Sequence, residues 1–233
     1  MIRANRQSRR PRWHRLVVVV ALAGACASAC ASAGTGGAQA TANPPMRAPG
    51  DTTGLIPAGF GSLRQDDIAI HLSNQGITVR AIPLDDNFIR TLAPDSHRAL
   101  LAIRDSRRAA VDSVRRRAGL QSVSVWYLTF ISIQQGESRF APYDVSMTGQ
   151  SRDFRPLDLI PITPGFSEQR LTQRQQATAL YVFDGALDPN QPLTMTVGTQ
   201  TGSDWRTVLQ RVESERARIR SRSGAGRDPG GDS

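Results

Sequence analysis

Residues 121–134 (QSVSVWYLTFISIQ) constrain the fold of this chain more than any other segment. Successive side chains of a strand point to opposite faces, and in this segment both faces are apolar in the middle. One face carries Val125, Tyr127 and Ile131, and the other carries Trp126, Leu128 and Phe130. A strand with this pattern has to be covered on both sides, so the segment is predicted to lie in the centre of a sheet with Trp126 in the core.

Several shorter segments show the alternation of strands and are separated by turn residues. They are residues 67–72, 77–84, 143–148, 153–162, 177–183 and 193–197. Pro83, Pro156 and Pro161 indicate sheet edges or irregular strand ends, because proline cannot donate a hydrogen bond to a β-ladder. Strands at this spacing predict a mainly β fold, an antiparallel β-sandwich of the immunoglobulin-like kind.

Two segments have the three- and four-residue spacing of amphipathic helices. Residues 94–118 are predicted to form one helix inserted between an early hairpin and the remaining strands, with Pro94 in its first turn and Gly119 just past its end. Residues 203–222 are predicted to form a C-terminal helix that docks the stripe containing Trp205 on the sandwich.

The polar face of the 94–118 helix is rich in arginine, above all at residues 115–117. One interpretation is a basic helix that contacts phospholipid head groups or another polyanion. The other is a solvated face with the pairs Asp105–Arg108 and Asp112–Arg116. The interleaved acidic residues dilute the positive charge and favour the solvated face.

The N-terminus has the three-part layout of a secretory signal, predicted over residues 1–25. A basic stretch precedes the apolar run 16–25 (LVVVVALAGA), and small residues follow it. Residues 26–50 have the composition of a flexible tether. The single β-sandwich domain is predicted over residues 51–222, with a disordered tail over 223–233.

Both cysteines of the chain, Cys26 and Cys30, lie directly after the apolar run, so no disulfide is available to the folded body. The segment 22–26 (LAGAC) resembles the lipobox of bacterial lipoproteins. This resemblance implies lipidation of Cys26, with Cys30 as the alternative, and location in the cell envelope. Because alanine follows either cysteine, it also implies sorting to the outer membrane, facing the periplasm. The alternatives are secretion or a periplasmic location after cleavage of the signal, and an uncleaved membrane anchor.

The net charge of +9 is concentrated at the ends of the chain. All 29 basic residues are arginines, and six of them lie in the first 15 residues. Residues 50–204 hold 15 arginines and 16 acidic residues. A nucleic-acid-binding protein carries its basic charge on the folded domain, so no nucleic-acid partner is predicted.

The sequence contains none of the common motifs for nucleotide binding, zinc binding or serine hydrolysis. No metal site or cofactor is predicted. Three groups of residues have side chains suited to metal binding or catalysis, but their spacing supports either role only weakly. They are a histidine pair (His71, His97), a calcium-like turn (Asp184, Asp188, Asn190) and scattered acidic residues suited to glycoside hydrolysis (Glu137, Asp144, Asp153, Asp158).

These observations predict a non-catalytic envelope lipoprotein whose β-sandwich binds another envelope protein or a glycan. Two alternatives remain open at this point. One is a hydrolase that uses the scattered acidic residues, and the other is a structural component that contacts the membrane surface.

Overall fold

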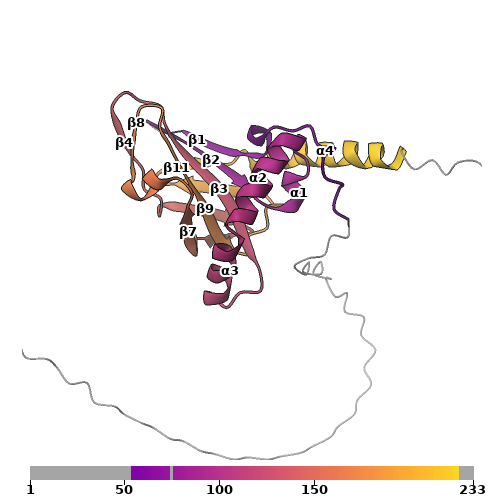
Figure 1. Cartoon of the computed structure of the whole chain (residues 1–233), viewed down its shortest axis with the longest axis horizontal. Coiled ribbons are helices and arrows are strands. Elements are labelled where there is room, and N and C mark those ends of the chain that lie inside the picture. Colours follow the sequence, from indigo (N-terminus) through magenta and orange to yellow (C-terminus); the bar gives the residue numbers. More distant parts are fainter. Residues whose placement is uncertain (1–53, 74–75, 226–233) are drawn as a thin grey trace, which may run out of the picture. The chain divides into compact units, whose positions relative to one another are not determined.

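The computed structural model describes residues 54–73 and 76–225. Its largest sheet has five antiparallel strands in the order β1-β2-β3-β9-β7 (Figure 1). These strands are Ile70–Ser73, Ile77–Pro83, Val123–Ser132, Gln176–Asp184 and Asp158–Pro161, respectively. The strand predicted from residues 121–134 is therefore β3, and it lies in the middle of the sheet as expected.

Two smaller antiparallel sheets complete the β-structure. The four-stranded sheet has the order β11-β10-β5-β6, with the bounds Gln200–Gly202, Leu193–Val197, Val145–Gly149 and Arg152–Phe154. The two-stranded sheet pairs β4 (Glu137–Arg139) with β8 (Arg170–Thr172). Short 3-10 helices span Gln65–Ile68 and Pro164–Glu168.

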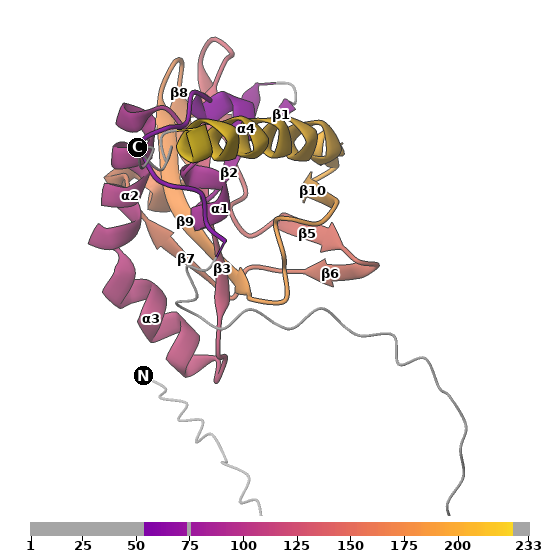
Figure 2. The same cartoon turned by 90° about the vertical axis from the view of Figure 1, so that its right-hand side faces the viewer.

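Helices cover both sides of the five-stranded sheet. They are α1 (Asp86–Ile89), α2 (Pro94–Ser106), α3 (Arg108–Arg117) and α4 (Trp205–Ala225). Figure 2 shows α2 and α3 on one side of this sheet and strands β10, β5 and β6 on the other, with α4 running across that second side. The described part of the chain is thus mainly antiparallel β-sheet with a C-terminal helix, as predicted.

The core forms where α4 meets the central strand. Trp126 on β3 is fully buried, and its ring centroid lies 5.3 Å from that of Trp205 on α4. Trp205 also stacks on Phe88 of α1 at 5.4 Å, and its indole Nε1 donates to the carbonyl oxygen of Pro189 at 2.9 Å. The predicted docking of the Trp205 stripe is confirmed, and it covers the Trp126 face of β3.

Proline marks the ends and edges of the five-stranded sheet as expected. Pro161 ends β7, which pairs with β9 alone and is an edge strand. Pro83 pairs with Trp126 of β3 beyond the last residue that β1 pairs. Pro156 separates β6 from β7, which belong to different sheets. The prediction of one irregular strand over residues 153–162 is therefore corrected to two strands.

The inserted helical segment also differs from the prediction of one helix over residues 94–118. It breaks at Arg107, whose backbone has φ −109° and ψ 5° and whose N–H donates to the carbonyl oxygens of Arg104 and Asp105. Pro94 begins α2 and Gly119 follows α3 with φ +66°, as expected. At the C-terminus, α4 continues to Ala225, so the first residues of the predicted tail are helical.

The first described segment is fixed against α4 and α1. Ser62 donates to Oε1 of Glu215 from its backbone N at 2.7 Å and from its Oγ at 2.9 Å. Leu63 forms a parallel bridge with Leu92. Gly61 lies so close to the backbone of Thr91 that a Cβ at this position would overlap the Thr91 carbonyl group. We call residues 56–63 the entry segment.

Within the residues that the structure describes, no helix has the length and apolarity needed to cross a membrane. Cys26, Cys30 and the predicted signal and tether lie outside the described residues, and so does most of the predicted tail.

Candidate functional site

The three residues of the calcium-like turn serve the turn itself. Oδ1 of Asp184 accepts from the backbone N of Ala186 at 2.9 Å, and Oδ1 of Asp188 accepts from that of Asn190 at 2.8 Å. The side-chain oxygen of Asn190, one of the candidate calcium ligands, accepts a hydrogen bond from the guanidinium of Arg216 at 3.2 Å. These contacts are those of ordinary Asx turns.

His71 and His97 lie in different elements, β1 and α2. Nε2 of His71 is 3.7 Å from Oδ1 of Asp66. Burial and the neighbouring Arg90 lower the pKa of His97. Among the residues that the structure describes, no group of three or more histidine, cysteine and acidic side chains is arranged to hold a metal ion.

The scattered acids are not gathered into one site. Glu137 lies between Arg139 and Arg170, Asp153 accepts from the hydroxyl of Thr148 at 2.7 Å, and Asp158 pairs with Arg117. Asp144 is exposed, and its backbone oxygen accepts from Gly198. These four residues come from separate strands and loops.

The arginine-rich helical face is largely paired with acids. Arg108 lies 3.0 Å from Asp105, which confirms that predicted pair. Asp112 pairs instead with Arg115 at 3.4 Å, not with Arg116 as predicted. Together with the Arg117–Asp158 pair, these contacts fit a solvated face.

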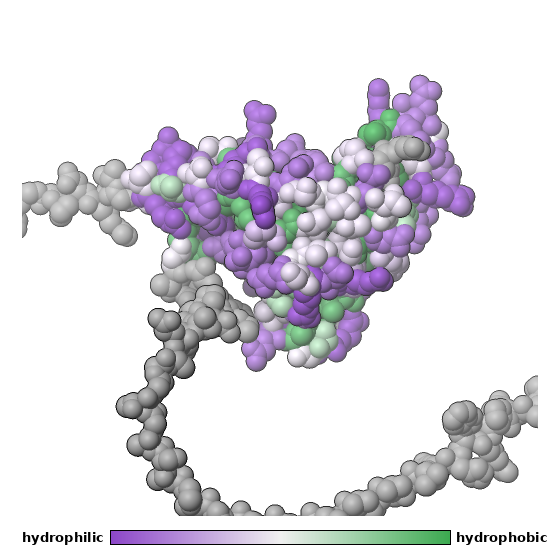
Figure 3. Space-filling view, turned by 180° about the vertical axis from the view of Figure 1, so that it is seen from behind, coloured by the Kyte–Doolittle hydropathy of each residue, from purple (hydrophilic) through white to green (hydrophobic). Residues whose placement is uncertain are grey.

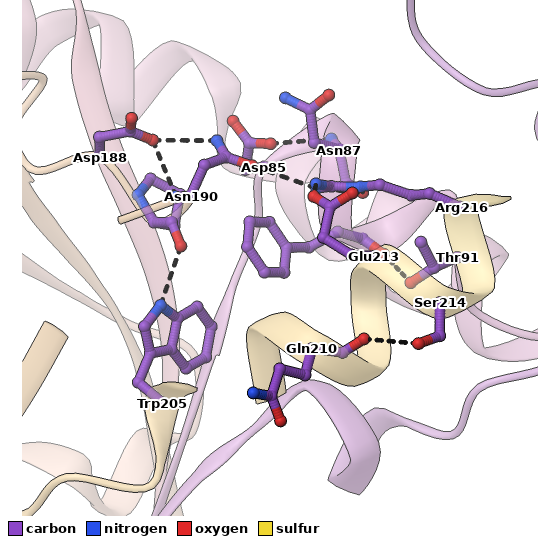
Figure 4. A network of polar contacts seen from close by, with 12 residues as sticks. Asp85, Asn87, Thr91, Asp188, Asn190, Trp205, Gln210, Glu213, Ser214 and Arg216 are labelled. Atoms are coloured by element: carbon purple, nitrogen blue, oxygen red, sulfur yellow. Dashed lines mark hydrogen bonds and ion pairs between the residues drawn. The ribbon is translucent and has the colours of Figure 1, made fainter. Parts of the chain in front are cut away.

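A polar network around the buried Arg216 holds α4 in place (Figure 4). The guanidinium of Arg216 donates to the backbone oxygen of Asn87 at 2.9 Å, pairs with Glu213, and lies 5.2 Å from the ring centroid of Phe88. Asp85 caps α1 by accepting from the backbone N of Asn87, and burial raises the pKa of its carboxyl group. Every member of the network has a structural partner, so we regard it as a stabilising network.

A polar pocket lies where residues of all three sheets meet. It has a volume of about 390 Å³ and is lined by Gly76, Ile77, Gln134, Ser138, Arg139, Thr199 and Gln200. Ile77 begins β2 and follows Gly76, Gln134 follows β3, Ser138 and Arg139 are on β4, and Gln200 begins β11 and follows Thr199. We call this site the three-sheet pocket.

Close packing positions the polar groups of the three-sheet pocket. Gln134 lies against Gly76, where a Cβ would be 2.5 Å from its Oε1, and its Nε2 donates to the backbone oxygen of Glu137 at 3.1 Å. The hydroxyl of Ser138 is buried, 2.9 Å from that of Ser132, and 3.4 Å from the carbonyl oxygen of Gly76. These contacts fix an amide and a hydroxyl group at the pocket wall.

The charge at the rim is positive. Nε of Arg139 is 3.6 Å and Nε of Arg170 is 3.7 Å from the same oxygen of Glu137, so two guanidinium groups share one carboxylate. Arg139 and Arg170 are cross-strand partners, but only Arg139 lines the pocket. Its side chain is 74% exposed, which leaves the guanidinium open to a ligand.

The surface seen from behind is mostly hydrophilic, with green areas that are small and separate from one another (Figure 3). The large apolar side chains that are exposed in the described residues are Phe60, Ile133, Tyr143 and Leu157. Of these four, Ile133 is next in sequence to a residue of the three-sheet pocket. The pocket itself offers mainly hydrogen-bonding groups.

Sequence reasoning did not find the three-sheet pocket. Its residues come from turns and strand ends far apart in the chain, and glutamine, serine and threonine in turns have no motif of their own. A usable signal was the occurrence of glutamine within two residues of glycine in two turns, at residues 134–136 (QQG) and 198–200 (GTQ). Only the sheet pairing shows that these turns lie near one another.

Comparisons with known proteins leave the family of this chain open. No protein-family model matches the chain, and no curated protein matches it. Among solved structures, it is similar to a protein of unknown function from Listeria monocytogenes. The identity is 11%, the TM-score is 0.29, and the match covers 58% of this chain and 74% of the other. A likeness at this level carries no inference about function.

Proposed function

We propose that this chain is a lipid-anchored protein of the cell envelope whose body is a non-catalytic binding module. The anchor rests on the lipobox-like segment, with Cys26 as the lipidated residue. The proposed location is the outer membrane, facing the periplasm. The finer form of the fold, an immunoglobulin-like β-sandwich made by the five-stranded and four-stranded sheets, is part of the same proposal.

The three-sheet pocket is the observation that supports binding. It lies among the turns at the β4–β8 end of the body, whereas the entry segment is fixed to α4 and α1 by Ser62, Arg90 and Arg218. Figure 1 shows the β4–β8 end away from the projecting end of α4. A ligand site placed away from the point where the tether joins stays accessible when the protein is held at a membrane.

The proposed ligand is an envelope component, a glycan or another protein, and the pocket favours the glycan. Stable protein–protein interfaces bury about 800 Å² on each partner and have apolar centres. A polar cavity of about 390 Å³ is nearer to the lower end of small-ligand sites, about 300–1,000 Å³. The hydrolase alternative lacks comparable support because Glu137, Asp153 and Asp158 each have a separate partner.

The anchor is tested with the two cysteines as matched variants. An apolar run of ten residues is too short to span a bilayer, which needs about 20. Lipid chains supply the missing affinity, at about 0.8 kcal/mol per buried CH₂ group. Cys26→Ser is therefore expected to abolish lipid labelling and to release the protein from the membrane fraction, whereas Cys30→Ser leaves both unchanged.

Three outcomes would contradict this assignment. Release by Cys30→Ser would move the lipidated residue to Cys30. A parent protein that is already soluble would favour simple secretion. An intact Met1 in the membrane fraction, found by N-terminal sequencing, would show an uncleaved anchor.

A further inference from the structure

We infer that the three-sheet pocket binds a saccharide that carries a carboxylate group, a conclusion that rests on the proposed binding function and names its ligand class. Gln134, Gln200 and Thr199 offer exposed amide and hydroxyl groups, and Arg139 offers a cation at the rim.

The amide and hydroxyl groups suit sugar hydroxyls. A sugar hydroxyl donates one hydrogen bond and accepts others, so it needs partners of both kinds side by side. Glutamine amides and serine or threonine hydroxyls each combine donor and acceptor capacity. The hydroxyl of Thr199 and the amide of Gln200 are exposed, whereas the Ser138 hydroxyl is buried against Ser132 and Gly76 and supports the wall from behind. The wall is therefore able to exchange hydrogen bonds with a sugar in both directions.

Arg139 supplies the preference for a carboxylate. Its Nε lies 3.6 Å from Glu137, which is longer than a hydrogen bond, and its side chain is 74% exposed. Glu137 is already shared with Arg170, so one carboxylate faces two cations. An arginine fork binds a carboxylate through two parallel hydrogen bonds, which are stronger than hydrogen bonds between neutral groups.

The size of the pocket limits the ligand to one or two sugar rings. Its volume is about 390 Å³, and four of its lining residues, Gln134, Arg139, Thr199 and Gln200, are exposed, so a longer glycan can continue out of the site. An acidic sugar can come from a cell-wall glycan whose lactyl carboxylate is free of peptide, or from a polysaccharide with uronic acids. These two sources share the ring hydroxyls and the carboxylate.

The test is a titration of the full chain in detergent with three sugars, in which binding is measured by NMR line shapes or by calorimetry. N-acetylmuramic acid and N-acetylglucosamine differ by a carboxylate-bearing lactyl group, and glucuronic acid represents the uronic-acid source. We expect N-acetylmuramic acid to bind about tenfold or more tightly than N-acetylglucosamine, because a charge-assisted contact is gained. If glucuronic acid also binds, the pocket accepts acidic sugars in general. If only N-acetylmuramic acid binds, the ligand is the cell-wall sugar.

Arg139→Gln and Arg170→Gln form the matched pair of variants. Both remove a cation that pairs with Glu137, but only Arg139 lines the pocket. Arg139→Gln is expected to weaken binding of the acidic sugar about tenfold or more, and Arg170→Gln less than about twofold. Gln200→Ala is expected to weaken both acidic and neutral sugars, with the exposed Gln210→Ala on α4 as its control.

Equal affinity for N-acetylmuramic acid and N-acetylglucosamine, or equal effects of the two arginine variants, would overturn the inference. Failure of all three sugars to bind would also overturn it. That failure leaves the proposed anchor untouched, since Cys26→Ser and Cys30→Ser report on membrane attachment without any sugar.

Discussion

Trp126 shows how a single side chain joins three elements of this protein. It extends from the middle of β3 and contacts Trp205 of α4, which in turn stacks on Phe88 of α1. Its indole Nε1 donates to the hydroxyl of Ser124 at 3.2 Å, so burial leaves no polar atom of the side chain unpaired. The apolar pattern of β3 was enough to predict that this residue is buried, but it could not identify the helix that covers it.

Trp126→Ala is expected to lower the free energy of unfolding by about 3–5 kcal/mol, since it removes a large buried ring and leaves a cavity. Chemical denaturation measures the change. Ile133→Ala is the control near the end of the same strand, because Ile133 is 57% exposed and its truncation should cost less than about 0.5 kcal/mol. Equal losses in the two variants would show that the ring of Trp126 is not a core residue.

Glu215 makes stability depend on pH. Hydrogen bonds from Arg218 and Ser62 lower the pKa of its carboxyl group below the ordinary value of 4.5. A lowered folded-state pKa means that the ionised form stabilises the fold. This contribution is complete above pH 4.5 and is lost as the pH falls through the folded-state pKa.

Glu215→Gln is therefore expected to lower the free energy of unfolding at pH 7 by about 1–3 kcal/mol, the contribution of hydrogen bonds to a charged group. The difference from the parent should shrink as the pH falls toward 3. Urea denaturation at several pH values measures it. A difference that is constant from pH 7 to pH 3 would contradict the role of the ionised carboxylate.

At the scale of elements, the sequence predicts the regular strands and misses the breaks. Residues 193–197 are predicted as a strand with the bounds that β10 has. No glycine or proline marks the break at Arg107, where the backbone N–H bonds back to the carbonyl oxygens of Arg104 and Asp105 at the end of α2. Pro156 signalled the division, but the sheet that each strand joins depends on its partner, which is the neighbouring β5 for β6 and the more distant β9 for β7.

The entry segment gives a test of packing between elements. In Gly61→Ala, the added Cβ would overlap the Thr91 carbonyl group, which itself accepts from the backbone N of Leu63 at 3.1 Å. We expect a loss of about 1–3 kcal/mol in the free energy of unfolding, the usual cost of overpacking. Gly165→Ala has open space around the new Cβ and should change stability by less than about 0.5 kcal/mol. Thermal melts of the two variants compare them directly, and similar melting temperatures would contradict the close approach.

At the scale of the whole molecule, the candidate site was the part that the sequence could not predict. Its lining combines residues separated by more than 100 positions, such as Gly76 and Gln200, and their meeting depends on how the sheets pack. Gly202 of β11 illustrates this packing, since a Cβ there would lie 2.9 Å from Cδ2 of Leu72 on β1. Residue types alone indicated acidic residues and histidines as candidate site residues, but these side chains lie apart from one another in the folded protein.

The attachment of the entry segment has a mechanical consequence. If the chain is held at a membrane through its N-terminus, any tension enters the body at Gly54 and is borne in sequence by contacts at Ile56, Phe60 and Ser62. These contacts are hydrogen bonds to the side chains of Arg90, which follows α1, and of Arg218 and Glu215 on α4, and they lie ahead of the first paired strand. In single-molecule stretching from residue 54, we expect residues 54–62 to peel away first and to extend to at most about 30 Å, at about 3.5 Å per residue. The sheets and the three-sheet pocket would then remain folded while the entry segment extends under tension.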